Sequence, residues 1–393
     1  MYNFQMQFRR KLPAWLLPSI GGLIVLAVWI GLGLLSEEAP EASTPEEGGA
    51  SLLAYLSPSD NTAEVQAMDF GIGQVVQLTD SAGVTFFAVD PAGEYLIISI
   101  RNDQNGADLW RADLLSGASQ PLHECGPSTC ESPRISPDGA WLVFQRSTPG
   151  VAYIPEIWLL NLESGEAERV SDSARPSRDP AWAGSEALGY YEPDLSAFVL
   201  VDLDGDPIAE FANESGGAAS WAADGASLIA SEQSVVNTSI LRGPSGEAAF
   251  DTPEPGSQSA VEVLSSQLLQ YSLDGGSQPL LDYSDPLVED ALPVLSPDGR
   301  WLAFTRKYLD EESWTPGRQL WLLNMESGDL VQLTNSPNHQ VIAIAWSPDG
   351  QQLAYVRANQ VEFQNPLELW ITNLDGSASQ LIAVDSYAPA WMP

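Results

Sequence analysis

The sequence predicts an all-β fold: a single β-propeller of about seven four-stranded blades, with six or eight blades also open, in residues 50–393. Three observations predict it. A strand–turn–strand pattern recurs along the chain, most copies are separated by about the length of one blade, and the two chain ends match complementary parts of one repeat. One transmembrane helix is predicted ahead of the propeller.

The clearest copies of the repeat contain the tetrapeptide SPDG. They occupy residues 134–146, 294–306 and 345–357, where SPDG separates an apolar run from a run of aromatic and β-branched residues. Pro fixes φ, Asp bonds to the local backbone and Gly accepts positive φ, so each tetrapeptide predicts a tight turn between strands. This structural role, preferred over cation binding or catalysis, is assigned to Asp138, Gly139, Asp298, Gly299, Asp349 and Gly350.

A second hairpin follows each of these copies, in residues 156–170, 319–334 and 368–382. In each, an apolar strand meets a polar ESG or LDG turn and continues into another strand. Each unit therefore has four short strands in up-and-down order, as in a propeller blade. Weaker copies begin near residues 88, 181 and 220.

The spacing of the copies bears on the number of blades. The residues before the first turns are separated by 46, 47, 39, 74 and 51 residues, and these residues are Val89, Ile135, Trp182, Trp221, Leu295 and Trp346. The step of 74 residues leaves two alternatives. Either residues 268–283 complete the blade opened at Trp221 after an insertion, or residues 238–251 complete it and an eroded eighth blade lies near residues 259–291.

The two ends of the body match one repeat between them. Residues 387–393 align with the strand before an SPDG turn, and residues 51–80 supply the strands that follow such a turn. We expect the terminal strands to pair and complete one blade, with Trp391 buried at the closure of the ring. A ring closed in this way protects its sheet edges.

Together, the SPDG turns, the LAF-type strands and the LW-N-xSG hairpins resemble the TolB-like (WD-like repeat) β-propeller family of exported bacterial proteins. The resemblance covers nearly all of residues 51–393 and implies a fold more than a function. TolB has a small extra domain ahead of its propeller, where this chain has an apolar segment and an acidic one. The particular partners of TolB are therefore not carried over to this chain.

The amino-terminal segments predict how the body is attached. Residues 1–13 end in three basic residues, residues 14–35 contain no charge, and residues 36–49 are rich in Glu, Pro and Gly. An uncharged stretch of this length predicts a membrane anchor, and the basic flank predicts a cytoplasmic amino terminus. We expect a single-pass protein of the cell membrane with an acidic stalk at 36–49 and a periplasmic or extracellular propeller. A cleaved signal peptide is the alternative.

Composition restricts the function classes. The chain has 16 basic and 53 acidic residues, a formal charge of −37 and two histidines. This charge argues against a nucleic-acid partner, because phosphate binding requires clustered Lys and Arg. No nucleophile elbow, P-loop, zinc-protease motif or dinucleotide-binding motif occurs, so we expect no catalytic residues, metal or cofactor.

Three further features have structural interpretations. Cys125 and Cys130 lie in a Gly/Pro/Ser loop and are expected to form a disulfide in an exported body. The VDLDGDP segment at 201–207 is read as a hairpin turn rather than a calcium loop, since residue 213 is Asn where an EF-hand has Glu. Two sets of tryptophans recur once per repeat and are read as packing between blades: Trp110, Trp158, Trp321 and Trp370, and Trp182, Trp221, Trp346 and Trp391.

The expected function is that of a binding or scaffold module of the cell envelope, with a protein, peptide or glycan partner. The alternative is a propeller enzyme, lactonase-like or lyase-like, that uses carboxylates around the channel with or without a divalent metal. A cluster of Asp, Glu, Asn and His at one channel mouth would favour the enzyme. The sequence identifies neither the partner nor the oligomeric state.

Overall fold

A computed structural model describes residues 52–81, 83–150, 154–172, 174–238, 261–283, 287–310 and 313–393. They belong to one compact unit, Gly49–Pro393. The predicted cytoplasmic segment, anchor and stalk lie outside the described residues. Within the described ranges every regular element is a β-strand, and no helix is long and apolar enough to cross a membrane.

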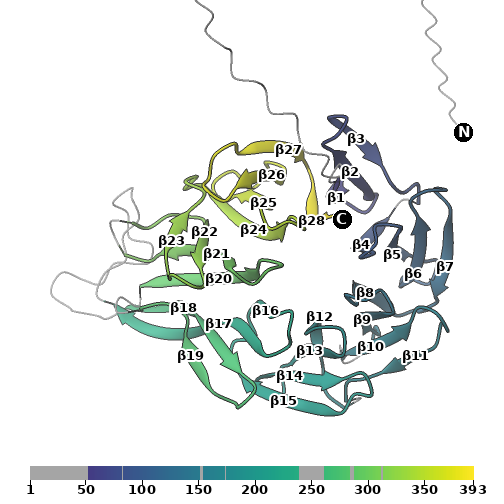
Figure 1. Ribbon diagram of the computed structural model, residues 1–393, viewed down its shortest axis with the longest axis horizontal. Coiled ribbons are helices and arrows are strands. Elements are labelled where there is room, and N and C mark those ends of the chain that lie inside the picture. Colours follow the sequence, from purple (N-terminus) through teal and green to yellow (C-terminus); the bar gives the residue numbers. More distant parts are fainter. Residues whose placement is uncertain are drawn as a thin grey trace, which may run out of the picture. The chain divides into compact units, whose positions relative to one another are not determined.

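The strands form groups of four that follow one another along the chain (Figure 1). Group 1 contains β28 (Tyr387–Trp391), β1 (Leu52–Ser57), β2 (Glu64–Asp69) and β3 (Gln74–Gln77). Group 2 contains β4 (Val84–Val89), β5 (Tyr95–Arg101), β6 (Ala107–Asp113) and β7 (Ser119–His123). Group 3 contains β8 (Thr129–Ile135), β9 (Trp141–Ser147), β10 (Pro155–Asn161) and β11 (Ala167–Arg169).

The remaining groups repeat the same order. Group 4 contains β12 (Arg178–Trp182), β13 (Ala187–Glu192), β14 (Ala197–Asp202) and β15 (Pro207–Ala212). Group 5 contains β16 (Ala219–Trp221), β17 (Ser227–Thr238), β18 (Val261–Ser272) and β19 (Ser277–Pro279). Group 6 contains β20 (Val288–Leu295), β21 (Trp301–Tyr308), β22 (Gln319–Asn324) and β23 (Leu330–Gln332). Group 7 contains β24 (His339–Trp346), β25 (Gln352–Asn359), β26 (Glu368–Asn373) and β27 (Gln380–Val384).

Within each group the strands pair antiparallel, and single parallel pairs join group 2 to group 3 and group 5 to group 6. The first strand of each group contacts the first strand of the next, from β4 through β8, β12, β16, β20 and β24 to β28, which contacts β4 again. The strands therefore surround a common centre, as Figure 1 shows. Sheets arranged in this way form a β-propeller.

Burial falls from the second strand of a group to the fourth. Leu142, Val143 and Phe144 of β9 are fully buried, whereas β7, β19 and β23 lie at the outer edge with mostly exposed side chains. The continuous apolar runs of the second strands fit this position, because a strand covered on both faces has no polar face. Polar outer strands keep the free sheet edges in water.

The hydrophobic core lies between groups. In the described part of the chain, seven clusters of buried apolar side chains each join two consecutive groups. One cluster packs Leu53, Tyr55 and Trp391 of group 1 against Val356 and Leu369 of group 7. The first and last groups in the sequence are thus packed together like any other neighbours.

The long step after Trp221 corresponds to an extended hairpin. β17 and β18 pair over 12 residues each, and β19 pairs with β18. Residues 261–279 therefore complete the group that β16 opens. The second alternative, in which residues 238–251 supply these strands, does not fit this pairing.

Candidate functional site

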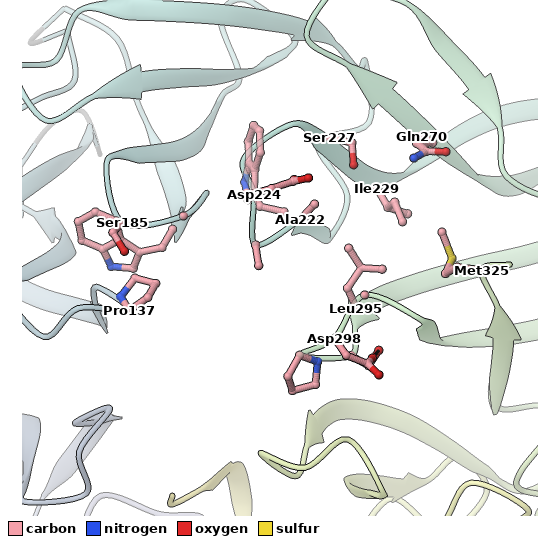
Figure 2. A pocket seen from close by; sticks show the side chains of 17 residues that line it. Pro137, Ser185, Ala222, Asp224, Ser227, Ile229, Gln270, Leu295, Asp298 and Met325 are labelled. Atoms are coloured by element: carbon pink, nitrogen blue, oxygen red, sulfur yellow. Dashed lines mark hydrogen bonds between the residues drawn. The ribbon is translucent and has the colours of Figure 1, made fainter.

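One cavity, of about 690 Å³, opens beside the turns that connect first and second strands. Its walls come from the turns after β12, β16 and β20, the ends of those strands, parts of β17 and β18, Met325 after β22, and Pro137 of the turn after β8. Figure 2 shows Pro137 and Ser185 on one side of the cavity, Leu295 and Asp298 on another, and Asp224 between them. Because four groups contribute to it, the cavity exists only when these groups are packed together.

The three SPDG turns have one construction. In each, the Gly N–H donates to the Ser carbonyl oxygen at 2.9 Å, and the Gly has a φ of 75°, 71° or 68°. The Ser hydroxyl donates to the Asp carboxylate at 2.5, 2.7 or 2.6 Å. The Asp carboxylate also accepts the N–H of the residue after Gly. These turns comprise Ser136–Gly139, Ser296–Gly299 and Ser347–Gly350.

The turn carboxylates are therefore engaged within their own turns. The Ser136 hydroxyl, followed by the Ala140 N–H, lowers the pKa of Asp138, and the Ser296 hydroxyl and the Arg300 N–H do the same for Asp298. Hydrogen bonds to the charged form of a carboxyl favour that form. Asp298 and Gly299 also line the cavity, whereas the other SPDG aspartates and glycines are not part of its lining.

Two tryptophans line the cavity beside these turns. The Trp182 indole Nε1 donates to the Arg134 carbonyl oxygen at 2.9 Å, which fixes its ring against the preceding group. Trp221 packs on Gly189, where an added Cβ would lie 2.1 Å from the indole ring, and its ring meets Phe211 edge-on. Both side chains are partly exposed. The cavity thus has fixed aromatic walls and two acidic side chains, Asp224 and Asp298.

Trp391 occupies the same repeat position as Trp182. Its Nε1 donates to the Ala345 carbonyl oxygen at 3.2 Å, as Trp346 Nε1 donates to Val294 at 2.9 Å. Trp182, Trp346 and Trp391 therefore each link their own first strand to the first strand of the preceding group. In the other set, arginine guanidiniums lie over the rings of Trp158, Trp321 and Trp370.

The cysteines and the acidic hairpin lie away from the cavity. Cys125, in the loop before β8, forms a disulfide with Cys130, near the start of β8. Asp202 accepts the N–H groups of Asp204 and Asp206 at 3.0 and 2.8 Å, so its carboxylate closes the hairpin turn. Among the residues that the structure describes, no three or more His, Cys, Asp or Glu side chains gather in a group that could hold a metal.

The sequence analysis did not single out Arg134. It lies in the first strand of group 3, where the aligned residues of other repeats are small or apolar: Ala88, Ala181, Ser220, Val294, Ala345 and Ala390. The available signal for Arg134 was that this repeat has an arginine where the other repeats have a small or apolar residue.

Comparisons with known proteins bear on the fold. No protein-family model and no curated protein sequence matches the chain. Solved structures do match it. The β-propeller domain of the Trilobed protease from Pyrococcus furiosus aligns with a TM-score of 0.53 and 13% identity, over 85% of this chain and 95% of that chain. Oligogalacturonate lyase in complex with manganese gives 0.54 and 13%, over 79% and 83%.

The fold is a β-propeller. TolB from Acinetobacter baumannii also matches, with a TM-score of 0.46 and 17% identity, over 87% of this chain and 67% of that chain. At such identities, similarity extends to the fold and not to the chemistry of a site. The structural neighbours include both enzymes and TolB.

Proposed function

We propose that the protein is a membrane-anchored, extracytoplasmic binding module whose propeller has seven blades closed by β28 and β1. The cavity beside the SPDG turns receives a segment of a protein partner in the cell envelope. The observation that carries the proposal is its lining, in which two fixed tryptophans stand beside Asp224 and Asp298 with no Lys or Arg. Tyr and Trp side chains with apolar faces are common anchors at protein interfaces.

The anchor and the outward orientation rest on the uncharged stretch at 14–35 and its basic flank. Protease added to spheroplasts should remove the propeller and leave a short membrane-bound stub. Recovery of the whole chain as cytoplasmic protein would contradict this orientation.

The binding role is tested by cross-linking in intact cells that carry the full chain. Asp224→Lys reverses a charge in the cavity at an exposed turn position, so the fold should survive. We expect this variant to lose a cross-linked protein partner. Glu163→Lys, which makes the same change on the exposed turn after β10, should keep it. Equal cross-linking by both variants would show that the partner does not bind at this cavity.

A further inference from the structure

A second cavity, of about 410 Å³, lies among the first strands of groups 3, 4 and 5. Its polar wall carries Arg134, Arg178 and Asp179, and its apolar wall includes Phe198 and Trp221. Trp221 also lines the larger cavity, so the two cavities share one side chain.

Arg134 differs from the other arginines described. Carboxylates pair with Arg169, Arg175, Arg178, Arg300, Arg306, Arg318 and Arg357. An amide binds Arg101, and aromatic rings lie against Arg111 and Arg146. The Arg134 guanidinium has no such contact with any residue that the structure describes. In a chain of formal charge −37, carboxylates are abundant, so an arginine without one stands out.

The charge of this cavity is therefore positive. Asp179 already pairs with Arg178, so one carboxylate stands against two guanidiniums. The Arg134 side chain is accessible to solvent but surrounded by the inner strands; this enclosure lowers the pKa of its guanidinium, and Asp179 raises it by a smaller amount. A guanidinium at the wall of a cavity, without a carboxylate in salt-bridge contact, favours an incoming anion.

Arg178 is held in a fixed position. Its Nη2 donates to the Gly216 carbonyl oxygen at 3.0 Å, and its guanidinium lies 4.8 Å from the centre of the Tyr191 ring. Gly216 has a φ of 56°, and a Cβ there would lie 2.7 Å from Arg178 Nη2. Glycine at this position thus allows the close approach. A preformed cationic wall lowers the entropic cost of binding.

The inner strands also bulge at this level. β8 bulges between Glu131 and Arg134, and β12 between Arg178 and Ala181. Ser132 and Asp179, at these bulges, have positive φ of 52° and 58°. Bulges commonly redirect side chains near the rims of closed sheets and next to sites. In groups 3 and 4 they lie beside the two arginines of the cavity.

We infer that this cavity binds a carboxylate carried on an apolar group, with Arg134 and Arg178 as its cationic partners and Phe198 and Trp221 against the apolar part. A planar guanidinium matches a carboxylate in geometry. A phosphate dianion would leave one negative charge uncompensated beside Asp179, so a carboxylate fits the local charge better. The inference does not depend on the proposed protein partner.

The test uses the full chain in detergent micelles at low chloride and titration calorimetry with N-acetylphenylalanine. Its amide, N-acetylphenylalaninamide, differs only by the charge. We expect saturable binding of the acid and at least tenfold weaker binding of the amide. Arg134→Gln should weaken binding of the acid at least tenfold, and Arg134→Lys by a smaller factor, because Lys keeps the charge and loses the planar fork.

Arg169→Gln removes the same charge from the outermost strand of group 3 and should leave binding unchanged. Arg134→Gln should keep the melting temperature of the parent, because the side chain has no partner to lose. Equal binding of acid and amide, no binding of either, or full binding by Arg134→Gln would overturn the inference.

Two further probes separate the sources of the carboxylate. 3-Phenylpropionate, a monoanion with an apolar group, represents a free small acid, and N-acetyl-Ala-Ala-Ala-Phe with a free carboxyl terminus represents the end of a peptide. The probe that binds more tightly identifies the source of the carboxylate. A loss of its affinity in Arg134→Gln supports the site. A probe that binds without Arg134 dependence counts against it.

Discussion

Groups 1 and 7 place the same residue in the same setting but attach it differently. Trp346 in β24 and Trp391 in β28 are each 8% exposed, and each donates its indole N–H to the first strand of the preceding group. They stand opposite Leu353 and Leu53 in their sheets. An SPDG turn ties β24 to β25, whereas no turn joins β28 to β1.

Without a tight turn, β28 depends on other contacts to keep its place beside β1. A tight turn joins β24 directly to its partner β25, but β28 pairs with β1, a strand more than 300 residues away in the sequence. Its position depends on pairing with β1, on the Met392 N–H donated to Leu52 O at 2.8 Å, and on the cluster around Trp391. Variants of group 1 can therefore show whether side-chain packing and a few backbone hydrogen bonds hold a strand in place when no turn joins it to its partner strand.

Removal of residues 387–393 should have the largest effect. It exposes the edge of β1 and the apolar surface around Leu53 and Tyr55. We expect a loss of about 5 kcal/mol or more in the free energy of unfolding, a large part of the 5–15 kcal/mol typical of folded proteins. Thermal unfolding should show a lower melting temperature, and light scattering should show aggregation through the free edge.

Deletion of residues 41–47 from the full chain removes the same number of residues from the acidic segment. This control should leave the melting temperature unchanged. If both deletions melt like the parent, β28 does not close the ring.

Trp391→Ala and Trp346→Ala should each cost about 3–5 kcal/mol, because both remove a buried aromatic side chain. The comparison predicts a difference in local opening. In Trp391→Ala, β28, which no turn joins to β1, should separate from β1 without global unfolding, so amide hydrogen exchange in β1 should accelerate. In Trp346→Ala, exchange in β25 should follow global stability. Equal exchange patterns in both variants would show that the turn adds nothing to local stability.

The strand order was predictable because the signals are local. An SPDG turn specifies its own hydrogen bonds, and an apolar run after it specifies a strand covered on both faces. The long hairpin of β17 and β18 was ambiguous because the intervening sequence has two turn-like segments that local patterns rank equally. Pairing across the hairpin decides between them, and pairing is not local.

The site was predicted less well for the same reason. Asp298 was assigned to its turn, and the structure shows that its carboxylate accepts hydrogen bonds within the turn. That the same turn borders a cavity with Trp221 depends on how groups 5 and 6 sit together. Arg134 and Arg178 are 44 residues apart in sequence and belong to different groups, so their shared cavity follows only from how groups 3, 4 and 5 pack together.

Trp391→Phe and Trp346→Phe isolate the hydrogen bond from the packing. Each keeps most of the buried ring and removes the indole N–H that reaches the neighbouring carbonyl. We expect a loss of about 1 kcal/mol in each case, the usual net value of a hydrogen bond. Chemical unfolding at equilibrium measures it. A loss as large as that of the alanine variants would mean that packing of the six-membered ring contributes little.

The smallest expected effect concerns the SPDG turn itself, which group 1 lacks between β28 and β1. Asp298, in the SPDG turn between β20 and β21 of group 6, provides the test. The Ser296 hydroxyl and the Arg300 N–H hold the pKa of Asp298 below its ordinary value near 3.9. A carboxyl with a lowered pKa stabilises the fold above its unfolded pKa and loses that contribution as the pH falls through the folded pKa.

Asp298→Asn should therefore lower the melting temperature at pH 6 by about 1 °C or less, since the side chain is half exposed and screened by solvent. The difference from the parent should shrink as the pH falls below the ordinary pKa of an Asp carboxyl and through the lower folded-state pKa, because the Asp298 carboxyl of the parent then becomes protonated. Glu163→Gln removes one negative charge from an exposed turn without that hydrogen-bond network, so it measures the general effect of charge in this acidic chain. A pH dependence equal in the two variants would assign the effect to net charge, and the SPDG turn would then owe its stability to Pro297 and Gly299 rather than to the carboxylate.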